Sequence, residues 1–445
     1  MTRRDLIKGA TAAVASTQFS RLAEASEADP TSEAKSMINV PFERRDKVRL
    51  GIIGVGGRGQ GVMSDFMGVE GVEVRAICDI VPDRLKESQA QLQKAGKPRA
   101  AEYGTSETDY KRLCARDDLD FIYIATPWKW HAPMAIDSMN EGKHCGVEVP
   151  VVTSIKDAWA IVDTSEKTRR HCMIMENCCY GYNELMVLNM VRKGLFGTLT
   201  HGEAAYIHDL RSLLLEDAGE GLWRRFPHID HNGNLYPTHG LGPVSNYMGV
   251  NRGDKFNTIV SLSSREAGLT EYRDKHLPAG DPKRKEKYRC GDMNTSILRT
   301  DAGLTVMLQH EVTSPRPYTR LNMIQGTEGV FTDYPAKIYI EGRSKNDAFE
   351  PIDSYKAEFE HDLWRKSGDL ARKMGGHGGM DFLMCFRVIE CFKNGTPPDM
   401  DVYDAAAWSA PGPLSEISNA KGGAPQKFPD FTRGKWRERK GTGGI

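Results

Sequence analysis

A glycine-rich segment from Gly54 to Gly59 carries the first residues with a defined chemistry. Its pattern, G-x-G-x-x-G, follows an apolar run and precedes a helical stretch, which is the context in which such glycines bind a dinucleotide. Gly54 allows a tight turn, Gly56 lets the backbone approach a pyrophosphate, and Gly59 permits close packing of the helix. Asp79 lies 20 residues beyond Gly59, where a carboxylate accepts hydrogen bonds from the adenosine ribose and repels a 2′-phosphate. The spacing therefore predicts an NAD site rather than an NADP site.

The segments around these residues alternate between predicted strands and predicted helices. Strands are expected at residues 48–53, 72–79, 121–127, 145–150 and 172–175. Helices are expected from the end of the glycine-rich turn at Gly59 to about Gly68, and at 82–94, 110–116, 132–141 and 155–167. Such alternation is typical of a parallel, doubly wound sheet with helices on both faces. Residues 46–168 are therefore predicted to form an NAD-binding Rossmann domain.

The second half of the chain has a different pattern of predicted strands and helices. Strands with period-two character are expected at residues 198–207, 258–263, 295–299, 304–311 and 321–325, and a helix at 380–393. Strands that follow one another without intervening helices favour antiparallel pairing. The fold class predicted for the whole chain is α/β. Residues 169–445 are expected to form an α+β substrate domain with a large, mainly antiparallel open sheet.

The first residues of the chain have the composition of an export signal. Arg3 and Arg4 precede a mild apolar stretch, and Ala23-Glu24-Ala25 matches an A-x-A cleavage pattern. Residues 1–25 therefore resemble a twin-arginine signal peptide, with a disordered basic tail as the alternative. Residues 26–45 are predicted to be a linker. A periplasmic or secreted protein follows from this interpretation.

Composition excludes several classes of partner. Lysine plus arginine and aspartate plus glutamate number 60 each, so charge gives no reason to expect nucleic acid. No apolar run approaches the roughly 20 residues of a membrane helix, and no membrane insertion is expected. The nine cysteines are an odd number without a C-x-x-C, which predicts neither a disulfide framework nor a metal site. Isolated disulfide pairs stay open for an exported chain.

Several sequence blocks resemble one family. Glu148-Val149-Pro150 stands where the Gfo/Idh/MocA oxidoreductases have Glu-Lys-Pro. The other matching blocks are Trp223-Arg224-Arg225, Asn232 to Pro243 around Tyr-Pro-Thr-His, Asn251 to Asp254, Pro315 to Tyr318, Gly376 to Asp381 and Pro429 to Gly434. Together they cover residues from about 45 to 437 and resemble glycoside hydrolase family 109, which is known for NAD-dependent α-N-acetylgalactosaminidases, many with twin-arginine signals.

The resemblance implies two sets of site residues. Around NAD it places Gly57, Arg58, Asp79, the run Trp128 to His131 (with Trp128, Trp130 and His131), Glu148, Val149, Asn177 and Tyr236. Around the sugar it places Tyr206, Arg225, Tyr236, Pro237, Thr238, His239 and Tyr318, with His228 and His231 as second-rank candidates. The lysine of Glu-Lys-Pro and the Asp-x-x-x-His pair of the wider superfamily are both missing, which argues against ordinary alcohol dehydrogenation.

The family's chemistry assigns roles to these residues. NAD⁺ oxidises C3 of the sugar, the ketone acidifies the C2 proton, the C1 substituent is eliminated, water adds, and the hydride returns. His239 suits the base at the C3 hydroxyl because histidine exchanges protons near neutrality. Tyr180 is a candidate for the C2 base if nearby cations lower its pKa, with a packed tyrosine as the alternative. Tyr236 is the third catalytic candidate, and Arg225 is expected to hold a substrate oxygen.

Export gives an argument independent of the family. Outside the cytoplasm no NAD pool replenishes a released cofactor, so a tightly bound NAD and redox-neutral chemistry are expected together. The alternatives are an exported sugar oxidoreductase and a non-catalytic sugar-binding protein. The exact sugar, its anomeric linkage, the aglycone and the C2 base stay open, and a homodimer through the second domain's sheet is expected from the resemblance.

Overall fold

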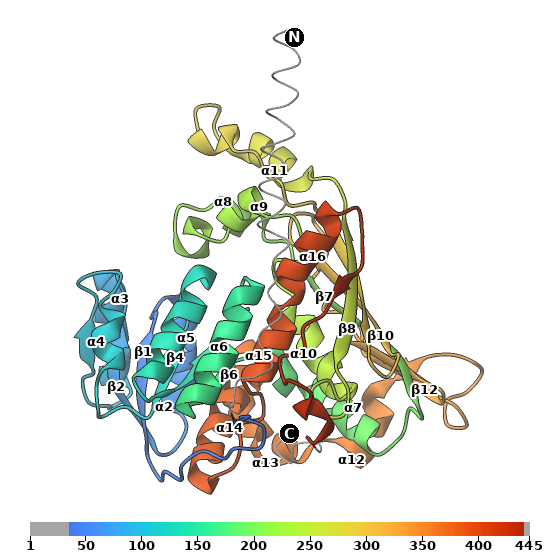
Figure 1. Cartoon of the computed structure of the whole chain (residues 1–445), viewed down its shortest axis with the longest axis horizontal. Coiled ribbons are helices and arrows are strands. Elements are labelled where there is room, and N and C mark those ends of the chain that lie inside the picture. Colours follow the sequence, from blue (N-terminus) through green and yellow to red (C-terminus); the bar gives the residue numbers. More distant parts are fainter. Residues whose placement is uncertain (1–34, 440–445) are drawn as a thin grey trace. The chain divides into compact units, whose positions relative to one another are not determined.

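The computed structural model describes residues 35–439, so the predicted signal peptide and residues 26–34 lie outside the described residues. Six strands form a parallel sheet in the order β3-β2-β1-β4-β5-β6. Figure 1 labels β1, β2, β4 and β6 of this sheet. They are β1 (Val48–Ile53), β2 (Val72–Cys78), β3 (Ala101–Tyr103), β4 (Phe121–Ile124), β5 (His144–Val147) and β6 (Cys172–Ile174). All four residues of β4 and of β5 are buried, as expected for a parallel sheet covered on both faces. This is the strand order of the Rossmann fold.

The helices that connect these strands agree with the predicted alternation. They are α2 (Gly57–Met67), α3 (Pro82–Lys94), α4 (Tyr110–Cys114), α5 (His131–Asn140) and α6 (Ile155–Thr168). Because β6 is hydrogen-bonded to β5, the sheet extends to Ile174. The domain boundary predicted at residue 168 is therefore too early, since it separates the last strand from its own sheet.

The second sheet has nine strands in the order β14-β13-β12-β11-β7-β10-β9-β8-β15. They are β7 (Leu199–Ile207), β8 (Phe256–Ser263), β9 (Asn294–Thr300), β10 (Thr305–Glu311), β11 (Met323–Gly326), β12 (Gly329–Thr332), β13 (Lys337–Ile340), β14 (Glu350–Pro351) and β15 (Gln426–Lys427). Only β7 and β10 pair in parallel among these strands. The predicted large, mainly antiparallel sheet is confirmed.

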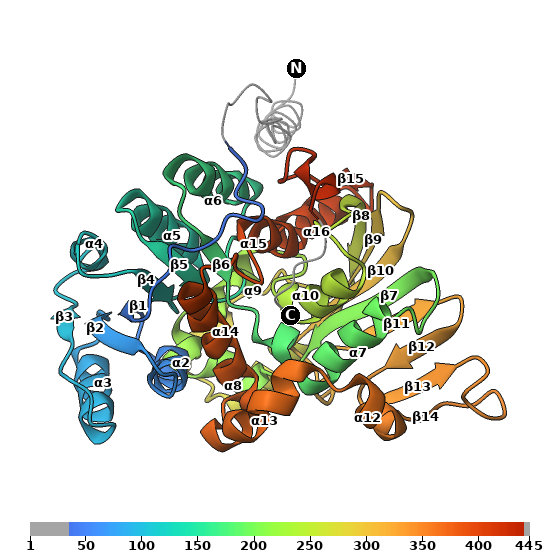
Figure 2. The ribbon, with the colours of Figure 1, turned by 90° about the horizontal axis from the view of Figure 1, so that it is seen from below.

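Helices cover one face of this second sheet (Figure 2). They include α10 (Thr238–Tyr247), which contacts β7, and α16 (Pro411–Ala420), which contacts β8. Two more helices, α14 (Met380–Asn394) and α15 (Val402–Ser409), return to the first domain, where α14 contacts α2 and α15 contacts α6 and β6. The two sheets are thus joined by the C-terminal part of the chain as well as by the link after β6.

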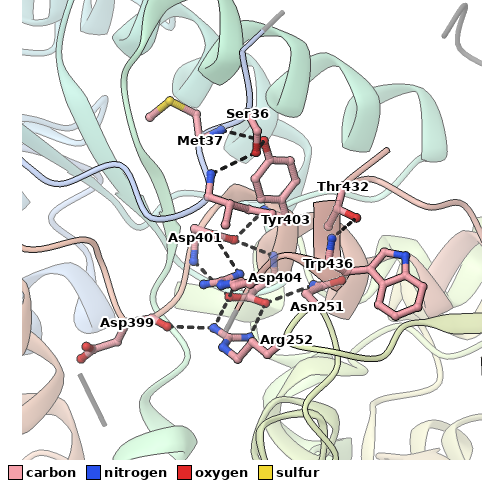
Figure 3. Close-up of polar contacts among 12 residues, drawn as sticks. Ser36, Met37, Asn251, Arg252, Asp399, Asp401, Tyr403, Asp404, Thr432 and Trp436 are labelled. Atoms are coloured by element: carbon pink, nitrogen blue, oxygen red, sulfur yellow. Dashed lines mark hydrogen bonds and ion pairs between the residues drawn. The ribbon is translucent and has the colours of Figure 1, made fainter. Parts of the chain in front are cut away.

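The helix α15 anchors both ends of the described chain (Figure 3). Its N-terminus is closed by a capping box between Asp401 and Asp404. The Tyr403 hydroxyl accepts a hydrogen bond from the Met37 amide at 2.9 Å, and Arg439 pairs with Asp401 at 2.9 Å. Arg252 adds a second cation, with its guanidinium 2.7 Å from the Asp404 carboxylate.

Two side chains of residues 35–45 reach into the core, although most of this segment is exposed. Met37 and Phe42 are buried, and the Phe42 ring stacks on Phe392 with centroids 4.0 Å apart. This part of the predicted linker, residues 35–45, is therefore anchored on the core by two of its apolar side chains, Met37 and Phe42.

All nine cysteines lie in the described part of the chain, and each is buried and unpaired. Within residues 35–439, no helix combines the length and apolar character needed to cross a bilayer.

Candidate functional site

The glycine-rich turn has the geometry that the sequence predicted. Gly54 adopts a positive φ of 85°, and a Cβ on Gly59 would lie only 1.9 Å from the Gly54 carbonyl oxygen. No side chain caps the N-terminus of α2. The first amides of this helix are therefore free to bind phosphate oxygens, and the glycines leave room for the pyrophosphate of NAD.

Asp79 follows β2 beside this turn. One carboxylate oxygen accepts the Val55 amide at 3.0 Å and the other accepts the Val81 amide at 2.9 Å. These bonds fix the carboxylate at the turn and leave each oxygen a further lone pair for a ribose hydroxyl. Ile80 and Val81 are exposed directly after Asp79 and offer an apolar surface for an adenine ring, which the sequence analysis did not identify.

Arg58 joins the NAD-binding domain to α14. Its guanidinium is 2.9 Å from Glu148 and 2.7 Å from Asp381, and Asn177 donates to the other oxygen of Asp381 at 2.7 Å. Tyr123 also donates to Glu148, at 2.7 Å. Three residues that the resemblance placed around NAD, Arg58, Glu148 and Asn177, are thus brought together at the carboxyl end of the parallel strands.

Asp65 of α2 gives this region a testable pH dependence. Burial, followed by repulsion from Asp381, raises the pKa of its carboxyl to about 7. An unfolded aspartate titrates near pH ~3.9, so the fold loses stability as the pH rises from about 4 to about 7, and no more above that. We expect Asp65→Asn to stabilise the protein at pH 8 by about 1 kcal/mol and to have little effect at pH 4.

Thermal unfolding at the two pH values measures this difference. Asp369→Asn, at a fully exposed position of α13 (Asp362–Met374), is the matched control. An equal effect of Asp65→Asn at both pH values would contradict the assignment.

Other predicted cofactor residues have structural roles. Both ring nitrogens of His131 lie 2.7 Å from backbone carbonyl oxygens, those of Pro150 and Thr126. The ring therefore links the segments that follow β4 and β5, and both of its nitrogens already have hydrogen-bond partners. Val149 is buried beside Pro150, so the position of the superfamily lysine holds an apolar side chain.

A cluster of aromatic rings lies where the two domains meet. Trp128, Tyr206 and Tyr236 pack together, with Tyr236 5.7 Å from Trp128 and 4.6 Å from Tyr206 between ring centroids. The Arg224 guanidinium lies over all three rings, 4.9 Å from the centroid of Tyr236, and Glu220 holds it at 2.5 Å. Arg224 thus gives the cluster a positive charge within reach of two tyrosine hydroxyls.

The prediction that Arg225 serves this site is wrong. Its guanidinium pairs with Glu286 at 2.9 Å and donates to the carbonyls of Leu214 and Gly221. All of its contacts are structural, and its neighbour Arg224 is the one that faces the rings. The sequence offered two adjacent arginines, and only the local turn decides which side chain points into the site.

His239 and Glu176 form the central polar pair. The His239 Nδ1 atom lies 2.7 Å from a carboxylate oxygen of Glu176, and Nε2 lies 3.5 Å from the Tyr236 hydroxyl. Burial alone would raise the pKa of Glu176, but attraction to His239 and its hydrogen bond outweigh burial and lower it. Glu176 is therefore ionised, and sequence analysis missed it because it follows β6, far along the chain from His239.

Tyr180 does not meet the condition set for a C2 base. Its ring is fully buried and its hydroxyl donates to Asp399 at 3.0 Å. Burial raises the pKa of this hydroxyl well above its usual value, and repulsion from Asp399 adds to the effect. The structure therefore matches the alternative, in which Tyr180 is a packed core residue.

Of the remaining predicted residues, one lies at the ring cluster and two position His239. Tyr318 is exposed and its ring lies 6.2 Å from Tyr206 and 5.0 Å from His208. Pro237 and Thr238 are buried at the start of α10, where they set the position of His239.

The second-rank histidines lie elsewhere. His231 pairs with Glu416 at 2.9 Å, and burial lowers the pKa of His228 to about 3. Neither contacts the ring cluster.

One set of side chains departs from the expectation of no metal site. Ligand atoms of Glu176, Cys178 and His239 lie within 4.8 Å of one another and could hold a metal ion. Burial raises the pKa of the Cys178 thiol well above its usual value, which disfavours the thiolate that a metal would need. Addition of a chelator to an activity assay tests whether this set binds a metal.

Comparisons with known proteins agree with this fold. Residues 48–176 match the oxidoreductase family with an NAD-binding Rossmann fold. Among solved structures, levoglucosan dehydrogenase in complex with NADH and levoglucosan is similar with a TM-score of 0.68 and 16% identity, over 86% of this chain and all of that chain. The chain is therefore an NAD-binding enzyme with the fold of the Gfo/Idh/MocA oxidoreductases.

The second half defines the family more closely. Residues 180–438 match the C-terminal domain of glycosyl hydrolase 109. A glycosyl hydrolase family 109 protein of Solibacter usitatus (strain Ellin6076) is 55% identical over 99% of both chains. One from Saccharopolyspora erythraea is 48% identical over 98% of this chain and 95% of its own length. The chain belongs to glycoside hydrolase family 109, and its sugar-modifying activity depends on NAD.

Proposed function

We propose that this protein hydrolyses α-N-acetylgalactosaminides or related hexosaminides by oxidation at C3, elimination across C1 and C2, addition of water and re-reduction. The observation that carries the proposal is the buried Glu176 carboxylate, 2.7 Å from Nδ1 of His239 and next to the aromatic cluster. N-acetylgalactosamine is the sugar that the resemblance to family 109 implies. NAD, when bound, supplies the reversible oxidation at C3.

His239 is the proposed base for the C3 hydroxyl. With Glu176 accepting from Nδ1, the proton of a neutral imidazole stays on that atom and Nε2 is left free to accept the hydroxyl proton. The negative carboxylate then stabilises the imidazolium that forms. His239 can return the same proton when the C3 ketone is reduced, so the pair ends the cycle unchanged.

Tyr206 and His208 are the proposed second proton-accepting unit. The Tyr206 hydroxyl lies 3.1 Å from Nδ1 of His208, and Arg224 lies over the tyrosine ring. Burial lowers the pKa of His208, so its imidazole is neutral at neutral pH and can accept a proton. Burial raises the pKa of the Tyr206 hydroxyl, and Arg224 offsets only part of that rise. Tyr206 would therefore take the proton from C2 only by passing its own hydroxyl proton to the neutral His208. This unit replaces Tyr180 in that role.

Val149 favours this chemistry over net oxidation of an alcohol. A lysine at this position would add a cationic proton donor, and the buried valine cannot exchange a proton. His239 is therefore the proposed base at C3. It accepts the proton of the C3 hydroxyl during oxidation and returns it when the ketone is reduced.

Hydrolysis of nitrophenyl α-N-acetylgalactosaminide in deuterated water, without added NAD, tests the proposal. We expect nitrophenol release with deuterium at C2 of the sugar product. No release from α- or β-hexosaminides would overturn the substrate class, and an oxidised sugar product would indicate an oxidoreductase. Release without deuterium would leave hydrolysis in place and count against the elimination route, unless a shielded base returns the same proton.

Export by the twin-arginine route is also proposed. The nine buried, unpaired cysteines support a chain that folds in a reducing compartment before it is exported. We expect Arg3→Lys/Arg4→Lys to move the protein from the periplasm to the cytoplasm, because this route reads the arginine pair. Immunoblots of the two fractions measure the change, and Lys8→Arg is the control. Unchanged export would contradict the route.

A homodimer is proposed through the uncovered face of the second sheet. Leu262 of β8 and Ile297 of β9 are exposed, and the register Val260 to Ile297 places them on the same face. We expect Leu262→Asp/Ile297→Asp to halve the mass measured by light scattering. The same mass for the variant and the parent would contradict this interface.

A further inference from the structure

A groove of about 420 Å³ lies beside the aromatic cluster, on the edge of the second sheet. It lies between the segment before β11 and the turn that joins β12 to β13. We call it the outer groove and define it by five of its lining residues, Arg316, Tyr318, Tyr334, Lys337 and Phe349. The proposed cycle assigns no task to four of them.

Tyr318 connects the outer groove to the ring cluster at the proposed site of the reaction. Tyr318 belongs to both, since its ring is 6.2 Å from Tyr206 and 5.9 Å from Tyr334. Tyr206 in turn lies 5.4 Å from the His239 ring. A row of rings therefore leads from the proposed base to the groove, so a substrate group attached to the reacting sugar can extend into it.

The groove exposes three large aromatic side chains. Tyr318, Tyr334 and Phe349 are 39%, 37% and 48% exposed. Aromatic rings grouped in a concave surface are typical of ligand sites, in which flat apolar faces carry the contact and polar groups fix orientation. The apolar faces of a pyranose ring match such side chains.

Charge narrows the choice of ligand. Within residues 35–439, no carboxylate pairs with Arg316 or Lys337, and the Lys337 ammonium instead lies over the Phe349 ring at 4.9 Å. The groove's one acid, Asp333, already accepts the Asn183 side chain at 3.1 Å and the Tyr334 amide at 2.7 Å. These neutral donors fix the position of the Asp333 carboxylate without removing its charge. Arg316 and Lys337 outnumber this one acid, so the groove carries a net positive charge for an anionic group of the ligand.

We propose that the outer groove binds the leaving-group part of a glycan substrate, and that this part is an anionic sugar bearing a carboxylate or a sulfate. The proposal rests on the glycosidase function given above. It assigns Arg316 and Lys337 to the anion and Phe349 and Tyr334 to the sugar ring. The outer groove, and not the residues that react with the first sugar, would then determine which leaving-group sugar the enzyme accepts.

Three disaccharides that differ only at C6 of the second sugar test the proposal. In each, α-N-acetylgalactosamine is linked to a second sugar, which is glucose, glucuronate or glucose 6-sulfate. The nitrophenyl glycoside has no second sugar and therefore measures the reaction without the groove. At low salt we expect kcat/KM to be about tenfold higher for an anionic disaccharide than for the neutral one. This advantage should shrink as salt screens the charges. The sulfate and carboxylate arms show which anion the groove prefers.

Variants separate the groove from the reaction. Arg316→Ala/Lys337→Ala should abolish the anionic advantage, and Phe349→Ala should lower kcat/KM for all three disaccharides about fivefold. Both should leave nitrophenyl turnover within twofold. Lys366→Ala/Lys373→Ala and Leu370→Ala, at exposed positions of α13, are the matched controls, and Leu370 is 48% exposed like Phe349.

Two outcomes would overturn the inference while leaving the glycosidase in place. One is equal kcat/KM for the neutral and anionic disaccharides, and the other is an anionic advantage that survives the double substitution. Absence of turnover of every substrate, the nitrophenyl glycoside included, would instead mean that the proposed function itself has failed.

Discussion

Glu176→Gln is expected to lower kcat by on the order of 10³-fold or more while leaving KM and the bound NAD nearly unchanged. An amide keeps the size of the side chain but can present its N–H to His239 Nδ1, which would leave Nε2 protonated and unable to accept a proton. It also removes the charge that stabilises the imidazolium. The loss should therefore appear in kcat and not in substrate binding.

Two further variants make this test specific. Glu176→Asp keeps the charge and should restore part of the activity, which a merely structural role would not predict. Glu166→Gln is the matched control, because Glu166 is also buried but lies outside the site, where it accepts hydrogen bonds from Tyr403 and Arg433. It should lower stability without lowering kcat of the folded enzyme. A Glu176→Gln enzyme with parental kcat would exclude the pair from the reaction.

Gly59→Ala is expected to abolish NAD binding and to destabilise the fold by about 3 kcal/mol. The added methyl group would lie 1.9 Å from the Gly54 carbonyl oxygen, so the turn and the start of α2 must separate. Denaturation of the purified protein and quantification of the released nucleotide measure the cofactor, and thermal unfolding measures stability.

Gly61→Ala, two residues further along α2 and exposed, is the control for that substitution. An added Cβ at Gly61 has no neighbour within 4 Å, and alanine favours a helix by about 1 kcal/mol over glycine. This variant should keep its NAD and unfold at an equal or higher temperature. A Gly59→Ala protein that still carries one NAD per chain would contradict the role of the close contact.

Local patterns made the NAD site predictable. Gly54, Gly59 and Asp79 lie within 26 residues of one another, and each is defined by the backbone next to it. The strand order then follows, because consecutive strands linked by helices have few ways to form a parallel sheet. For the nine-stranded sheet, the sequence predicted a large, mainly antiparallel sheet but not all of its strands. The short hairpin of β12 and β13 was missed because strands of four residues show little periodicity.

The sugar site was less predictable because its contacts cross the chain. Glu176 bonds a histidine 63 residues away, and Tyr180 is held by Asp399, 219 residues away. No spacing rule links such pairs. The choice between Arg224 and Arg225 shows a different limit, since the two are identical in type and adjacent, and only the turn after Trp223 separates their directions.

The anchoring of both ends of the described chain on α15 has a practical consequence. Ser36 and Met37 bond Tyr403 (Figure 3). Arg439 pairs with Asp401, two positions before Tyr403 in α15, so the two ends of the described chain lie close together. Domains whose ends are neighbours tolerate circular permutation. A short glycine–serine linker from residue 439 to residue 35 would let the chain be reopened in an exposed loop, such as the one between β13 and β14. The reordered enzyme would place a fusion partner beside the outer groove and leave α15 sealed inside the protein.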